Sequence, residues 1–166
     1  MQRLLLALLL CWLSITDTVA GCYEAAGGAR HRFVLRGGEA FDQKTGLTWK
    51  RCSLGLVWDG KHGCSGALRY ASLDEAAEAA KAEGGDWHVP SGPELESIID
   101  PACGNPVVDK AVFPDIRADE DGKAEYWTTN PVGAASLVYF FDFVTGSADG
   151  HSRGFELAVR FVKSAH

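Results

Sequence analysis

Apolar and polar residues repeat with two different periods along the chain. Between residues 72 and 99 the apolar positions recur every three or four residues, which is typical of amphipathic helices. After residue 125 they alternate or run on over short segments, which is typical of strands. The two periods predict an α+β fold, with two short helices packed on a mainly antiparallel sheet and long loops between the elements.

Two capping boxes mark the predicted helix starts. Ser72 is followed three residues later by Glu75, and Ser91 by Glu94, so each pair can satisfy backbone N–H groups of the first turn. The glycine pair 84–85 predicts the end of the first helix. Small residues give this helix a narrow inward face, and larger ones form the face of the second: Leu73, Ala76, Ala77 and Ala80, then Leu95, Ile98 and Ile99.

Six short stretches are predicted as strands. They cover residues 33–35, 40–42, 47–50, 126–129, 137–144 and 155–162. The stretch 137–144 is apolar at both odd and even positions, which predicts a central strand with both faces covered. Residues 52–64 and 146–154 are rich in glycine and polar residues and are predicted as loops. No internal repeat is evident.

The chain begins with a pattern typical of a secretory signal. A basic residue precedes an apolar run at 4–13, and a more polar segment ends at Ala20, so cleavage is expected between Ala20 and Gly21. The run is too short to span a bilayer, so no transmembrane segment is predicted. We therefore expect export, either to the periplasm or to the cell exterior.

The predicted organisation has three parts. Residues 1–20 form the signal peptide, 21–31 an irregular lead-in, and 32–163 the folded domain. A lipoprotein signal is the alternative, since residues 19–22 resemble a lipobox in which Cys22 would be acylated and anchored to a membrane. Polar residues separate the apolar run from this box, whereas lipoprotein signals usually bring the two together.

The composition and net charge of the chain argue against several classes of binding partner. The chain has 166 residues and a net charge of −6, which removal of Arg3 and Asp17 with the signal would not change. No basic stripe is visible, so the sequence argues against nucleic acid, anionic lipid and polyanionic glycan as partners. Hydrophobic residues make up 46% of the chain, enough for a buried core.

Export would place the cysteines in an oxidising compartment. The mature chain keeps four of them, which allow three connectivities. Cys52 and Cys64 flank one glycine-rich loop and are the natural short-range pair, which leaves Cys22 to pair with Cys103. That second bridge would argue against the lipid anchor, because an acylated Cys22 would leave Cys103 without a partner.

The sequence contains residues that suit two kinds of metal site, and we predict neither site. A zinc site would use the two loop cysteines with His62, but the closely spaced ligand pair typical of zinc is missing. The acidic segment 115–122 has the wrong register for an EF-hand, which would place Arg117 at position 1 and Thr128 at position 12. A looser calcium site in that segment stays open, and no cofactor is predicted.

Several short motifs follow one another in a characteristic order. They are Thr-Gly-Leu-Thr-Trp-Lys-Arg-Cys at 45–52, Gly-Cys-Ser-Gly at 63–66, Asp-Trp-x-x-Pro at 86–90 with the capped helix after it, Phe-Pro at 113–114, Tyr-Trp-Thr-Thr-Asn-Pro at 126–131, and the segments 139–146 and 158–162. Together they resemble the Lcl C-terminal-domain family of exported bacterial proteins, from about Arg32 to Lys163. His88 and Ser91 stand where the family pattern has arginine and asparagine.

The resemblance implies a C-type-lectin-like arrangement, in which loops carry binding sites more often than catalytic ones. It also implies glycans as the first ligand class to consider, since the adhesin that names the family binds host glycans. We therefore expect a non-enzymatic binding module of the bacterial envelope or surface, whose partner is an unknown glycan or envelope protein.

Two loops are the candidate ligand sites. The first is 56–62, in which Trp58 can stack on a sugar while Asp59 and His62 supply polar contacts; the second is 146–154, with Asp149, His151 and Arg153. For Trp58 the alternative is a ring that covers the core. Two other functions are kept: a structural subunit of an envelope assembly, and a cysteine-dependent oxidase acting through reduced Cys52 and Cys64.

Overall fold

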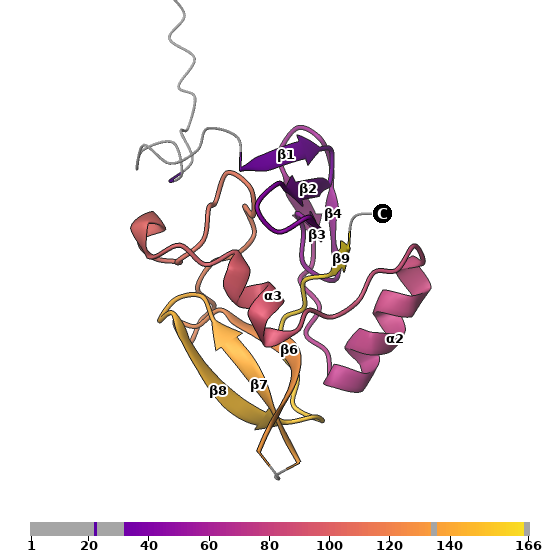
Figure 1. Ribbon diagram of the computed structural model, residues 1–166, viewed down its shortest axis with the longest axis vertical. Helices are drawn as coiled ribbons and strands as arrows, with labels where there is room; N and C mark the ends of the chain where they lie inside the picture. The colour runs from indigo at the N-terminus through magenta and orange to yellow at the C-terminus, as the bar shows by residue number, and fades with distance from the viewer. Residues whose placement is uncertain (1–21, 23–31, 134–135, 165–166) are drawn as a thin grey trace, which may run out of the picture.

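The computed structural model describes Cys22, residues 32–133 and residues 136–164 (Figure 1). The strands are β1 (Phe33–Arg36), β2 (Glu39–Asp42), β3 (Leu47–Lys50), β4 (Leu56–Trp58), β5 (Cys64–Gly66), β6 (Glu125–Val132), β7 (Leu137–Asp142), β8 (Ser147–Ser152) and β9 (Val162–Ser164). The helices are α2 (Leu73–Glu83) and α3 (Gly92–Ser97), followed by a 3₁₀ turn η1 (Pro101–Cys103). The predicted signal and its cleavage site lie outside the described residues.

The strands form three antiparallel sheets. Their orders are β1-β2-β3-β9, β4-β5 and β6-β7-β8. In Figure 1 the helix α3 lies between the two larger sheets, and α2 lies at one side. Helices and antiparallel sheets in one chain, together with two disulfides, confirm the predicted α+β class.

Both capping boxes are present as predicted. In each, the serine accepts a hydrogen bond from the N–H three residues on, and the glutamate accepts one from the serine N–H. Leu73, Ala76 and Ala80 are buried on α2, as the narrow face requires. The helix α3 ends at Ser97, sooner than expected, and Ile98 serves as its C-cap while remaining fully buried.

The three-stranded sheet corrects one loop prediction. The central place of β7 is confirmed, but residues 146–154 are not a loop, because Ser147–Ser152 forms β8 along the whole of β7. Four of the six residues of β8 are exposed, and four are polar. The backbone hydrogen bonds to β7 therefore define β8 as an edge strand. The pattern of apolar residues in this segment does not predict a strand.

Two further predictions are wrong because the structure of these segments also depends on which segments they pair with. Residues 52–64 are not simply a loop, since β4 pairs with β5 in a hairpin. Residues 155–162 are not one sheet strand: the buried segment 157–161 crosses the interior and meets Ala71 and Tyr126 through isolated bridges. Only Val162 and the residues after it pair continuously, as β9 against β3. A segment with a different neighbour at each step forms no ladder, however apolar it is.

A repeated turn was missed in the sequence. Phe-Asp-x-x-Thr-Gly occurs at 41–46 and at 141–146, after β2 and at the end of β7. In each turn the aspartate accepts from the backbone two residues on and from the threonine hydroxyl three residues on, and the glycine N–H closes the turn onto the aspartate carbonyl. Both glycines have positive φ, 72° and 73°.

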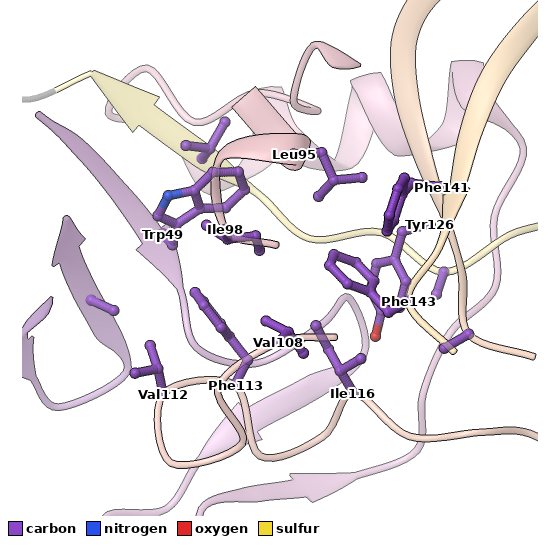
Figure 2. Packing of buried hydrophobic residues seen from close by; sticks show 14 residues of the cluster. Trp49, Leu95, Ile98, Val108, Val112, Phe113, Ile116, Tyr126, Phe141 and Phe143 are labelled. Atoms are coloured by element: carbon purple, nitrogen blue, oxygen red, sulfur yellow. The ribbon is translucent and has the colours of Figure 1, made fainter. Parts of the chain in front are cut away.

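The interior contains two apolar clusters. Figure 2 shows the first, in which Trp49, Phe113 and Phe143 are fully buried beside Leu95 and Ile98 from the α3 region. The second joins the small face of α2 to the opposite side of the three-stranded sheet, including Trp127 and Phe140. Trp127 Nε1 donates to the Ala71 carbonyl at 2.9 Å, which satisfies its only polar atom in the core.

Both predicted disulfides are formed. Cys52 is bonded to Cys64, and Cys22 to Cys103, with Cα–Cα separations of 5.5 Å and 4.9 Å. The first closes the base of the β4–β5 hairpin, and the second attaches the N-terminal side of the chain to the turn after α3. Among the described residues no helix is long and apolar enough to cross a membrane.

Candidate functional site

A groove with a volume of about 1190 Å³ opens beside the β4–β5 hairpin. Its other walls are the segment 114–126 and the stretch from His151 to Ala158. Three regions that are distant in the sequence therefore meet at one surface hollow, which makes it the natural candidate for a ligand site.

Aromatic side chains line this groove. Tyr70 is 43% exposed and Phe155 is 46% exposed, although large apolar side chains usually lie inside. The His151 ring stacks on Phe155 with centroids 3.9 Å apart, and on buried Phe140 at 4.8 Å on its other side. This three-ring stack fixes Phe155 in place while leaving its outer face open.

Carboxylates accompany the rings. The segment Asp119–Asp121 and Glu156 line the groove and are exposed. Tyr70 lines the same groove, and its pKa is raised, first by partial burial and then by the charges of Asp119 and Glu120, while Arg117 acts to lower it. We call the exposed set Tyr70, Glu120, Phe155 and Glu156 the rim.

Beneath the groove lies a buried polar cluster, Ser53, Asp115, Tyr126 and Arg160, which we call the floor. Arg160 Nη2 donates to Asp115 Oδ1 at 2.7 Å and to Ser53 Oγ at 2.9 Å. Ser53 Oγ also lies 2.8 Å from Tyr126 Oη, and its N–H donates to the other Asp115 oxygen at 3.0 Å. The floor thus pairs a buried cation with a buried anion through shared hydrogen bonds.

The pKa values agree with this pairing. Burial alone would raise the pKa of Asp115, but the Arg160 guanidinium and the bonds from Ser53 hold it below its ordinary value. Burial alone would lower the pKa of Arg160, and the Asp115 carboxylate raises it. Burial raises the pKa of the Tyr126 phenol, which therefore stays protonated. Both members of the ion pair remain charged at neutral pH.

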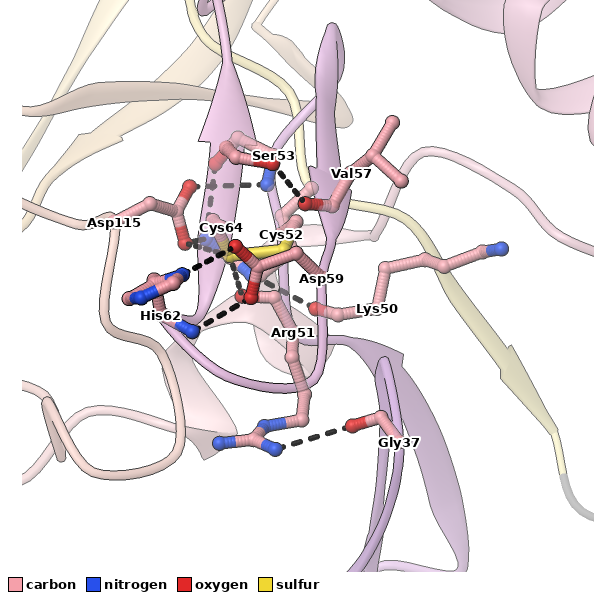
Figure 3. Close-up of a disulfide and its surroundings, with 12 residues drawn as sticks. Gly37, Lys50, Arg51, Cys52, Ser53, Val57, Asp59, His62, Cys64 and Asp115 are labelled. Carbon is pink, nitrogen blue, oxygen red and sulfur yellow. Dashed lines mark hydrogen bonds and ion pairs between the residues drawn. A yellow bond between two sulfur atoms is a disulfide. The ribbon is translucent and has the colours of Figure 1, made fainter.

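The disulfide and Arg51 hold the hairpin against the floor. Figure 3 shows Cys64 beside Asp115, whose Oδ1 lies 3.7 Å from the sulfur. The buried Arg51 donates to the carbonyls of Gly37, Ala111 and Val112. These contacts tie the wall of the groove to two distant segments and favour a preformed site.

The six candidate ligand residues do not form one site. His62 and His151 both line the groove. Trp58 has the Arg51 guanidinium 3.6 Å from its ring centroid, so one face is covered, as expected for a ring that shields the interior. Asp59 accepts from the backbone of Lys61 and His62 and so shapes its own turn (Figure 3).

The other two candidates face different partners. Asp149 lies on β8 and accepts from the N–H of Gly150. Arg153 forms an ion pair with Asp74 in the first turn of α2. Sequence reasoning missed Tyr70, Phe155 and Glu156, whose neighbours carry no motif, and treated Glu120 only as part of a calcium candidate.

The geometry bears on the residues of both metal alternatives. Cys52 and Cys64 are bonded to each other and cannot act as zinc thiolates. Within the described residues no group of three or more histidine, cysteine, aspartate or glutamate side chains is placed to hold a metal ion. Asp119 Oδ1 instead accepts from the N–H groups of Asp121 and Lys123, which folds the acidic segment on itself.

Comparison with known protein families places the site within a family domain. A family model described as the Lcl C-terminal domain matches residues 38–163. The matched range covers every residue of the rim and the floor, and both cysteines of the hairpin disulfide. A search of curated proteins finds none that matches the chain.

Proposed function

Since the chain belongs to the Lcl C-terminal domain family, we propose that it is an exported, non-enzymatic binding module of the bacterial envelope or surface, and that its ligand lies in the groove. The ligand class at this level is a glycan or a protein segment. The outer face of Phe155 is the observation that carries the proposal, because this ring is immobilised by His151 and yet nearly half exposed.

Exposed rings beside polar groups suit recognition. An open aromatic face can stack on a sugar ring or on a peptide side chain, while nearby carboxylates fix the orientation. The floor supports this use, because a preformed wall reduces the ordering cost of binding. Of the rim side chains, Phe155 is stacked on His151 and is still nearly half exposed.

Two alternatives predict different chemistry. A cysteine-dependent oxidase would need Cys52 and Cys64 reduced, and their bond favours the binding module. A structural subunit would use broad surfaces and would tolerate loss of the rim. Free thiols in the purified native protein, together with oxidase activity, would favour the first alternative over the proposal.

Export is part of the proposal and has its own test. The bond between Cys22 and Cys103 supports an oxidising compartment and a Cys22 that is disulfide-bonded and not acylated. The intact mass of the protein isolated from its host should match a chain that starts at Gly21 and carries two disulfides. A diacylglycerol adduct on Cys22 would contradict cleavage after Ala20 and favour the anchored form.

The binding proposal is tested with defined ligands. The disulfide-intact chain is screened on a glycan array and on a peptide array, and the best ligand is titrated against Phe155→Ala. The matched control is Leu35→Ala, since Leu35 is 44% exposed on β1 and is not part of the groove lining. Loss of affinity in Phe155→Ala alone supports the groove, whereas equal affinity of both variants and the parent contradicts it.

A further inference from the structure

The groove lining carries an excess of negative charge that the fold leaves unpaired. Asp115 is neutralised by Arg160, and Glu125 by Lys123 at 3.0 Å. What remains is the segment Asp119–Asp121 and Glu156 against the single cation Arg117. Carboxylates this close together repel one another, and a cationic ligand would relieve that repulsion.

A strand edge faces the same groove. Among the described residues β5 pairs only with β4. The Asp59 N–H donates to the Gly63 carbonyl at 3.0 Å, and the alternation of an antiparallel pair then turns the backbone groups of Cys64 and Gly66 away from β4. Both residues line the groove, so this edge of β5 is the one that an extended chain in the groove would meet.

We propose that the groove binds an extended basic segment of a partner polypeptide, paired through its backbone to β5. Lysine or arginine side chains of the segment contact the acidic segment and Glu156, and their aliphatic stems lie on Tyr70 and Phe155. This proposal specifies the ligand of the groove and rests on the proposed function. A polyamine or an amino sugar carries the charge but has no strand backbone, so the edge favours a polypeptide.

The aromatic rim strengthens this choice. Tyr70, Asp119 and Glu120 line the same groove, and in addition to partial burial the two carboxylates raise the pKa of the Tyr70 hydroxyl, while Arg117 lowers it. A cation entering between them meets carboxylates on one side and a ring face on the other, which is a favourable setting for ammonium and guanidinium groups. Phe155 also lines the groove and offers a second exposed ring.

The test uses defined probes with the disulfide-intact chain. A labelled peptide of alternating lysine and threonine, about ten residues long, is titrated by fluorescence anisotropy at low salt and in about 0.15 M salt. Peptides with glutamate or serine in place of lysine give the charge dependence. Spermine and fully deacetylated chitosan oligomers serve as cationic competitors, and a lysine peptide with alternate backbone N-methyl groups tests strand pairing.

A charge variant locates the site. Glu120→Gln with Glu156→Gln keeps the shape of two exposed side chains and removes two charges, and should weaken the lysine peptide about fivefold. The control pair, Glu78→Gln with Glu96→Gln, removes the same charge from exposed positions on α2 and α3 outside the groove lining and should change affinity less than about twofold.

The outcomes are separable. Preference for the lysine peptide, loss on N-methylation and weakening in the groove variant alone support the proposal. Equal binding of the serine peptide, equal potency of spermine, or equal effects of the two charge variants overturn it. If a neutral glycan binds and is lost in Phe155→Ala, the proposed function stands while this inference fails; if no array component or probe binds, both fail.

Discussion

The floor and the rim of the groove use similar residue types in opposite ways. In the floor, Arg160 and Asp115 are buried and every charge has a partner. In the rim, Glu120 and Glu156 are exposed, and neither forms a side-chain hydrogen bond or ion pair within the described residues. The hydroxyl of Tyr126 in the floor is hydrogen-bonded to Ser53, whereas Tyr70 of the rim is 43% exposed to solvent.

This difference separates stability from binding. Removing one partner of a buried ion pair leaves an uncompensated charge and is costly, while exposed groups contribute little to folding. The floor should therefore determine whether the groove exists, and the rim whether it binds.

The largest effect is expected in the floor. Arg160→Met keeps the volume of the side chain but leaves Asp115 buried without its cation, which should lower the free energy of unfolding by about 3–5 kcal/mol. Denaturant unfolding measures the change. The control is Arg117→Met, which removes an exposed arginine of the groove and should alter stability by less than about 0.5 kcal/mol. Similar costs for both variants would abolish the distinction between floor and rim.

The hairpin disulfide should come next. Cys52→Ala with Cys64→Ala opens a short loop at the groove wall and should cost about 3 kcal/mol, mainly by freeing the unfolded chain. Thermal unfolding of the variant, compared with the parent under non-reducing conditions, measures it. A melting temperature equal to that of the parent would mean that the hairpin is held by Arg51 and the floor alone.

Acid should weaken the floor in a defined direction. The pKa of Asp115 is lowered from an ordinary value of 3.8, so its contribution is complete above that value and is lost as the pH falls through the depressed pKa. Unfolding midpoints between pH 7 and pH 2 should fall most steeply below about pH 4, and less steeply in Asp115→Asn. Parallel curves for parent and variant would show that Asp115 is not the titrating group. Asp42, whose pKa is also lowered, should maintain part of the slope in both proteins.

Local chemistry explains what the sequence predicted well. Both helix starts depend on serine and glutamate three residues apart, and the first hairpin on residues 33–42, so short windows contain the information. The disulfides followed from counting four cysteines in a chain that the sequence predicts to be exported. The repeated turns at Asp42 and Asp142 were equally local and could have been found by comparing Phe-Asp-x-x-Thr-Gly with itself.

Long-range contacts explain what it missed. The strand β8 exists because β7 lies beside it, and the segment 157–161 is buried by different neighbours at successive residues. The rim joins Tyr70, Glu120 and Phe155, which are far apart in the chain and carry no common motif. In the sequence, Arg160 is one residue of an alternating strand pattern. No neighbouring residue indicates that it forms an ion pair with Asp115.

The smallest stability effect belongs to the rim and bears most directly on the central claim that the groove binds. Tyr70→Ala with Phe155→Ala should change the free energy of unfolding by less than about 1 kcal/mol, since both rings are nearly half exposed. The reverse control is Ser91→Ala, which removes a helix cap outside the groove lining and should cost about 1 kcal/mol with unchanged binding.

The decisive measurement is the affinity of both variants for the best ligand found on the arrays, taken at a temperature where each is fully folded. We expect the rim variant to lose binding by tenfold or more, at about 1.4 kcal/mol per factor of ten, while Ser91→Ala binds like the parent. Retained affinity in the rim variant, or an equal loss in both, would contradict this expectation.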